Sequence, residues 1–129
     1  MDRSAVQRWV ARYERAWRTP GTEQLGEVFS SKVRYVPSPW VRPLEGLDEL
    51  APFWEARDGP DEKFAFRSDV VAIEGDTAVV RIFVDYRRAD VGRWRNLWVL
   101  RFTSDGRCQG FEEWPFAPGQ HDGHEPRDP

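Results

Sequence analysis

The second half of the chain alternates between runs rich in β-branched and aromatic residues and short turns rich in Gly and Asp. Turns of this composition reverse the chain within a few residues, so successive runs pair as antiparallel hairpins. This feature constrains the fold more than any other, because it predicts a meander in which each strand lies beside the next. The expected strands cover residues 64–73, 78–87, 94–103 and 108–116.

The first half of the chain has helical spacing instead. Apolar residues recur every three or four positions between Ala5 and Trp17, which predicts an amphipathic helix capped by Ser4 and ended by Thr19-Pro20-Gly21. A short second helix is expected over residues 22–29, followed by a strand over 33–36.

A third helix is predicted after Gly46, ending near Asp58-Gly59-Pro60. Three helices followed by strands predict an α+β fold, in which the N-terminal helices pack against one face of a curved antiparallel sheet of four to six strands.

The length of 129 residues suits one domain. A content of 40% hydrophobic residues, with seven Trp, favours a packed core. We expect one domain over residues 1–118 and a disordered tail over 119–129, which has no apolar periodicity.

Charge and cysteine content exclude several classes of function. The net charge is -3 with both signs interspersed, so no nucleic-acid partner is expected. The single Cys108 forms no internal disulfide, and His121 with His124 in the tail does not make a metal site. Without an apolar leader or spanning segment, a cytoplasmic protein with no membrane partner is expected.

The strand over residues 78–87 indicates which sheet face is buried. Side chains alternate between the two faces of a strand, so Val80, Ile82 and Val84 share one face. That face is expected to pack against the helices. Val79 and Phe83 are apolar exceptions on the outer face, which favours a homodimer formed through it.

Trp94, Asn96 and Trp98 also share one face of a strand. An aromatic wall with an amide in its middle favours a small-molecule pocket over a plain core. The residues expected to contact an apolar ligand are Trp17, Tyr35, Trp40, Trp54, Tyr86, Trp94 and Trp98. Helical spacing also allows Trp54 to belong to the core, and the proline-rich loop makes Trp40 a candidate lid.

Glu113 is the candidate acid or base. Apolar walls raise the pKa of a carboxyl group by disfavouring its charged form. Alternation admits only one of Glu112 and Glu113 to the pocket, and a one-residue bulge would exchange them. Glu113 could instead pair with an arginine at the rim. Asn96 and Tyr13 are candidate hydrogen-bond donors to a ligand, or else a structural amide and a core tyrosine.

The chain over about residues 3–116 resembles the nuclear transport factor 2-like superfamily, in its SnoaL-like and ketosteroid-isomerase-like branch. The resemblance implies a cone-shaped sheet, a cystatin-like α+β barrel, closed by helices around a pocket. Such proteins include isomerases, cyclases, dehydratases, epoxide hydrolases and non-catalytic modules. The residues that carry it are Tyr13 with Trp17, Leu25 to Phe29, Tyr35-Val36-Pro37, Pro43 to Gly46, Phe53-Trp54, Gly75 to Val80 and Leu100 to Arg107.

The resemblance also carries over residue by residue. Tyr13 matches the tyrosine that donates to an oxyanion in the isomerases, but Pro37 and Trp98 stand where they place their two carboxyl groups. This departure excludes steroid-type isomerisation. Ile82 and Val84 likewise replace the Arg and Asp of the epoxide hydrolases, whereas Glu113 matches their carboxylate on the last strand.

These expectations combine in one functional hypothesis. The chain is expected to bind an apolar small molecule without metal or cofactor, and either only to bind it or to carry out acid/base chemistry of isomerase, cyclase or dehydratase type with Glu113. The alternative is a non-catalytic ligand-binding or dimerisation module of the same fold.

Overall fold

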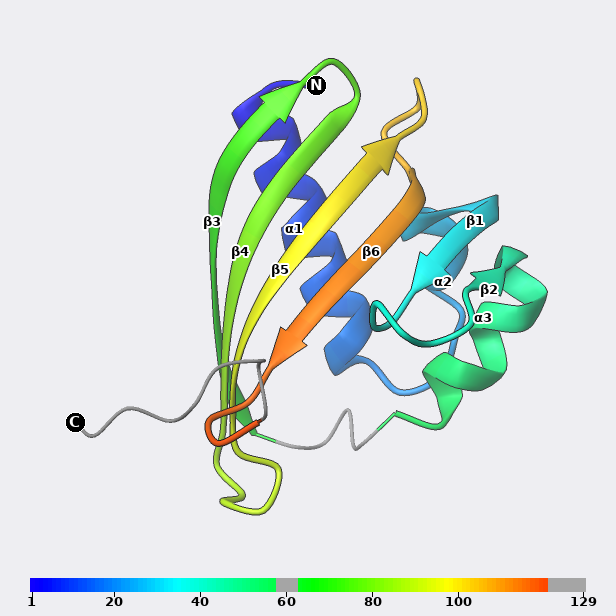
Figure 1. Cartoon of the computed structure of the whole chain (residues 1–129). Coiled ribbons are helices and arrows are strands. Elements are labelled where there is room, and N and C mark those ends of the chain that lie inside the picture. Colours follow the sequence, from blue (N-terminus) through cyan, green and yellow to red (C-terminus); the bar gives the residue numbers. More distant parts are fainter. Residues whose placement is uncertain (58–62, 121–129) are drawn as a thin grey trace.

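The computed structural model describes residues 1–57 and 63–120. It confirms the α+β class, with helices packed on a curved sheet (Figure 1). The tail predicted over 119–129 lies outside the described residues from position 121 onward. The elements in chain order are α1 (Arg3–Arg18), α2 (Leu25–Val28), β1 (Phe29–Val36), β2 (Leu44–Glu45), α3 (Gly46–Glu55), β3 (Phe64–Glu74), β4 (Thr77–Tyr86), β5 (Arg93–Phe102) and β6 (Cys108–Phe116).

The sheet has the strand order β2-β1-β6-β5-β4-β3. The four long strands β3 to β6 form the predicted antiparallel meander, but β1 pairs with β6 in parallel. The parallel pair brings the first strand beside the last one, a long-range contact that hairpin turns do not predict. Figure 1 shows α1 lying across one face of the meander, while α2 and α3 lie towards the β1 end.

The helix boundaries differ from the sequence expectations in three places. Asp2, rather than Ser4, caps α1, since its carboxylate accepts a hydrogen bond of 2.8 Å from the backbone N–H of Ala5. The second helix is one turn, because Phe29 already pairs with Cys108 in the sheet. The third helix ends at Glu55, and the predicted stop at 58–60 lies outside the described residues.

The core lies between α1 and the inner face of the sheet. Val80 and Ile82 are fully buried there, which confirms the predicted inner face of β4. Trp9 of α1 is also fully buried, and its indole N–H donates to the carbonyl of Val28 at 2.9 Å. Its ring packs edge-on against Trp98, with the centroids 6.2 Å apart. Aromatic packing of this kind ties α1 to the middle of the sheet.

Candidate functional site

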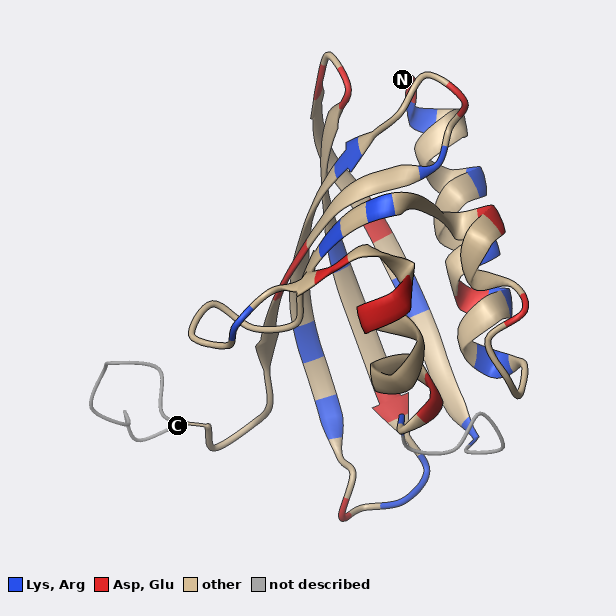
Figure 2. Ribbon diagram, turned by 90° about the vertical axis from the view of Figure 1, so that its right-hand side faces the viewer, with Lys and Arg blue, Asp and Glu red and all other residues tan. Residues whose placement is uncertain are grey.

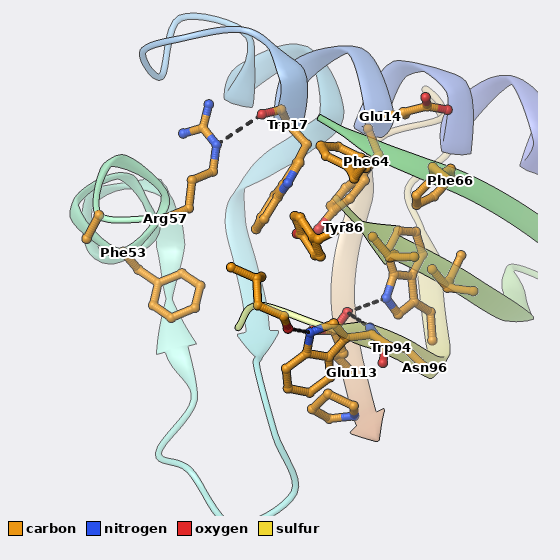
Figure 3. Close-up of a pocket in the computed structure, with 17 residues that line it drawn as sticks. Glu14, Trp17, Phe53, Arg57, Phe64, Phe66, Tyr86, Trp94, Asn96 and Glu113 are labelled. Carbon is orange, nitrogen blue, oxygen red and sulfur yellow. Dashed lines mark hydrogen bonds between the residues drawn. The ribbon is translucent and has the colours of Figure 1, made fainter. Parts of the chain in front are cut away.

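A pocket of about 470 Å³ opens between α1, the end of α3 and the inner face of the meander (Figure 3). This volume falls in the range of sites that enclose small organic molecules. Its walls are mostly aromatic and aliphatic, and they come from six separate segments of the chain. The lining residues are Tyr13, Glu14, Trp17, Phe53, Ala56, Arg57, Phe64, Phe66, Ile82, Val84, Tyr86, Val91, Trp94, Asn96, Trp98, Glu113 and Pro115.

Glu113 reaches the pocket because β6 contains a β-bulge. Cys108 and Phe111 both point into the core although they are three positions apart, since Gln109 has no partner on β5. An extra residue shifts the alternation of side chains by one. Alternation from Cys108 would turn Glu112 inward, whereas after the bulge Glu113 lines the pocket and Glu112 lies on the outer face.

Two N–H groups hold the carboxyl group of Glu113 by one oxygen. The indole of Trp98 donates to Oε2 at 2.6 Å, and the amide of Asn96 donates to the same atom at 3.5 Å. The other oxygen, Oε1, accepts no hydrogen bond within the described part of the chain, and no ion pair forms there with Glu113. The rim pairing with an arginine is therefore absent from residues 1–57 and 63–120.

Burial raises the pKa of Glu113 to about 7, and the bonds from Trp98 and then Asn96 partly oppose that rise. The neutral and ionised forms are consequently both populated near neutral pH. A carboxyl group in this state can give a proton to a ligand or take one from it, which is the property required of a general acid or base.

Tyr13 lies beside this carboxyl group. Its ring packs edge-on against Trp98 with the centroids 4.5 Å apart, and its hydroxyl lies near that of Tyr35. Burial is the main cause that raises the pKa of both tyrosines, so both stay protonated at neutral pH. Tyr13 lines the pocket, whereas Tyr35 lies behind it, stacked on Phe111 at 4.4 Å.

Asn96 is held from two sides. Besides donating to Glu113, it accepts a hydrogen bond of 3.3 Å from the backbone N–H of Phe116 through Oδ1. This fixes which end of the amide faces the carboxyl group. Asn96 thus links β5 to β6 at the pocket floor.

The expected aromatic residues divide between the pocket and other places. Trp17, Tyr86, Trp94 and Trp98 line the pocket. Trp54 lies in the core, 1% exposed and edge-on to Tyr13, as its helical spacing allowed. Trp40 is 97% exposed and does not line the pocket, because its turn projects the ring into solvent.

Arg57 was not anticipated from the sequence. Its guanidinium donates to three backbone carbonyls, those of Trp17 at 3.1 Å, Trp54 at 2.7 Å and Thr19 at 2.5 Å. It therefore joins the C-terminal ends of α1 and α3 at the pocket mouth. An arginine just after the last turn of a helix is a signal that could have indicated this contact. Phe53, Phe64 and Phe66 are further lining residues that the pattern did not single out.

The described residues contain no group of three or more His, Cys, Asp and Glu side chains that could hold a metal ion. His121 and His124 lie outside the described residues. No helix described here is long and apolar enough to cross a membrane. Figure 2 shows both basic and acidic positions on the helices and on the strands.

The curved sheet closed by helices around a pocket defines a nuclear transport factor 2-like fold. Residues 7–110 match the model of the SnoaL-like domain, and the chain belongs to that family. No curated protein matches the chain in sequence.

Solved structures of low sequence identity share the fold. SalBIII, an epoxide hydrolase/cyclase-like enzyme of pyran ring formation in the polyether salinomycin, is 13% identical, with a TM-score of 0.70 over 89% of this chain and 93% of its own. A SnoaL-like protein assigned as an isomerase from Agrobacterium tumefaciens is 17% identical, with a TM-score of 0.68 over 88% and 99%. An NTF2-like protein of unknown function from Burkholderia xenovorans is 11% identical, with a TM-score of 0.69 over 93% and 89%. At these identities the likeness establishes the fold alone.

Proposed function

We propose that the pocket binds an apolar, ring-containing small molecule and that Glu113 transfers a proton to or from it without metal or cofactor. The observation that carries this proposal is a carboxyl group that lines an aromatic pocket and whose Oε1 accepts no hydrogen bond from the described residues; burial raises its pKa to about 7. Reactions of isomerase, cyclase or dehydratase type need such a group at neutral pH.

The other residues have supporting roles in this proposal. Trp17, Tyr86, Trp94 and Trp98 form the ligand walls, and Tyr13 and Asn96 offer polar groups beside Glu113. SalBIII and the isomerase-assigned protein share the fold, which supports a ring-forming or isomerising reaction only by analogy. Steroid-type isomerisation is not proposed, because Pro37 and Trp98 stand where, by the resemblance described above, the isomerases place their two carboxyl groups.

Two successive measurements test the proposal. Titration with neutral ring compounds should quench or shift the tryptophan fluorescence, because Trp94 and Trp98 line the pocket. Compounds that bind are then incubated with wild-type protein, Glu113→Gln and the outer-face control Glu112→Gln, and products are followed by NMR. We expect turnover by the wild type and by Glu112→Gln only. No fluorescence response contradicts ligand binding, and binding without Glu113-dependent turnover favours the alternative below.

The alternative is a non-catalytic module that dimerises through the outer face of the sheet. Apolar side chains on that face support a homodimer whether the protein is an enzyme or a non-catalytic module, since Trp114 is 39% exposed and Phe116 is 43% exposed. Leu97 lies directly beside Trp114 in the sheet register and extends this surface. A cytoplasmic location completes the proposal, because the single thiol of Cys108 is buried and needs no oxidising compartment.

A further inference from the structure

The floor of the pocket contains a carboxyl group that has no counterion among residues 1–57 and 63–120. Glu113 receives hydrogen bonds only from the neutral groups of Trp98 and Asn96, and both reach Oε2. Glu113 lines the pocket, and its Oε1 accepts no hydrogen bond from the described residues. A half-buried carboxylate gains most from a ligand group that brings both a hydrogen-bond donor and a positive charge.

The cationic side chains at the pocket do not meet this need. Arg57 is the only Lys or Arg among the described residues that line the pocket. Its guanidinium bonds the carbonyls at the ends of α1 and α3, and Figure 3 shows it on the other side of the pocket from Glu113. Arg18, one turn after the lining residue Glu14 on α1, pairs with it at 2.9 Å. An anionic ligand group at the floor of the pocket would therefore be repelled by the carboxylate of Glu113 and would find no cation beside it among the described residues.

The walls are suited to a cation. Ring faces attract positive charge, and the attraction is stronger where water is excluded. Two rings at the pocket already carry a guanidinium on the face, since Arg18 lies 3.9 Å from the ring centre of Phe64 and Arg57 lies 5.7 Å from that of Trp17. Trp94 lines the same pocket as Glu113, and its N–H is fixed on the carbonyl of Val91 at 3.0 Å.

We propose that the ligand is an apolar amine, bound as its ammonium ion with an N–H donated to Oε1 of Glu113 and with the carbon skeleton against the aromatic and aliphatic walls. This inference rests on the proposed function, because it names the class of small molecule that the same pocket takes. The ionised carboxylate that pairs with the ammonium is also the form of Glu113 that acts as a base.

Ammonium binding depends on pH in a defined direction. Only the ionised form of Glu113 is a counterion, so affinity falls as the pH drops through its pKa of about 7. The buried hydroxyls of Tyr13 and Tyr35 stay neutral over this range, because burial raises their pKa. Among the described residues, the other titratable or charged groups that line the pocket are Tyr86, Glu14 and Arg57.

Three rigid probes that differ only in their polar group test the inference: adamantanamine, adamantanol and adamantanecarboxylate. At pH 8 we expect the amine to bind at least about tenfold more tightly than the alcohol, and the carboxylate most weakly. Lowering the pH from 8 to 6 should weaken amine binding about tenfold and leave alcohol binding nearly unchanged. Tryptophan fluorescence or calorimetry provides the affinities.

The substitution Glu113→Gln keeps the size of the side chain and removes its charge. It should weaken amine binding at least about tenfold while changing alcohol binding less than about threefold, and Glu112→Gln should change neither. Near-UV circular dichroism verifies that each variant is folded. Amine binding no tighter than alcohol binding, or equal losses of both in Glu113→Gln, overturns the ammonium inference and leaves the proposed pocket intact. If none of the three probes binds, both proposals are contradicted.

Discussion

Glu113 shows at the residue scale how a functional group opposes stability. Burial disfavours its ionised form, and the 2.6 Å bond from Trp98 only partly compensates for the lost hydration. A chain selected only for stability would place an uncharged side chain at this position. The retention of a carboxyl group beside Trp98 is thus consistent with a role in binding or proton transfer.

This opposition predicts a pH-dependent gain of stability in Glu113→Gln. The pKa of Glu113 is about 7 in the folded protein and near the ordinary 4.5 when unfolded, so the unfolding free energy of the wild type decreases as the pH rises between these values. The glutamine side chain does not ionise, so the unfolding free energy of Glu113→Gln lacks this decrease with pH. We expect it to be more stable than the wild type at pH 8 by up to about 3 kcal/mol, and the difference to shrink towards pH 4.

Urea denaturation of both proteins across this pH range measures the effect. Glu112→Gln, on the outer face of the same strand, is the matched control and should follow the wild type. A constant difference between Glu113→Gln and the wild type at all pH values would show that burial does not raise the pKa of Glu113.

At the level of secondary-structure elements, Arg57 joins the C-terminal ends of α1 and α3. The C-terminal carbonyls of a helix lack partners within the helix and carry partial negative charge. The guanidinium satisfies carbonyls of Trp17 and Thr19 at the end of α1, and of Trp54 in the last turn of α3. It also lies 5.1 Å from the ring centre of Trp54. These contacts hold the two helices around the pocket mouth.

Arg57→Ala should therefore destabilise the protein by about 2 kcal/mol or more, because three charge-assisted hydrogen bonds are lost at once. Arg42→Ala is the matched control. Arg42 is an exposed arginine that pairs with Glu49 at 3.6 Å, so its loss should cost less than about 1 kcal/mol. Urea denaturation of both variants gives the comparison, and equal costs would contradict the role of Arg57.

On the outside of the sheet, Leu97 lies beside the exposed Trp114, and Phe116 extends this apolar patch along β6. Leu97 lies between Arg81 on β4 and Trp114 on β6, with its side chain on this face. If the proposed homodimer forms there, Leu97→Lys should halve the mass observed by size-exclusion chromatography with light scattering, towards the 15.1 kDa of one chain. A like charge from each copy would face the other across a symmetric interface.

Trp40→Lys is the matched control for this prediction. Trp40 is the more exposed apolar residue, at 97%, but it lies in the loop between β1 and β2 and not on the outer face of the meander. We expect this variant to keep the mass of the wild type. A wild-type protein that is monomeric at all concentrations would contradict the dimer.

Local sequence patterns predicted the helices apart from their exact ends, the four long strands and the inner face of the sheet. Residues such as Val80 and Ile82 reveal that face because the spacing of apolar side chains depends only on local backbone geometry. The short motifs that carry the resemblance also depend on local structure, because they mark where helices and strands begin and end. They therefore identified the superfamily.

The assembly of the site depends on strand register and long-range packing, which local patterns do not specify. The bulge at Gln109 turns Glu113 rather than Glu112 inward, and it depends on how β6 pairs with β5. Long-range contacts also produce the parallel pairing of β1 with β6 and the bridge from Arg57 to the end of α1. Trp40 lies outward because its loop does not pack it against the pocket. Periodicity specifies which side chains share a face, whereas register and long-range packing specify which of them meet.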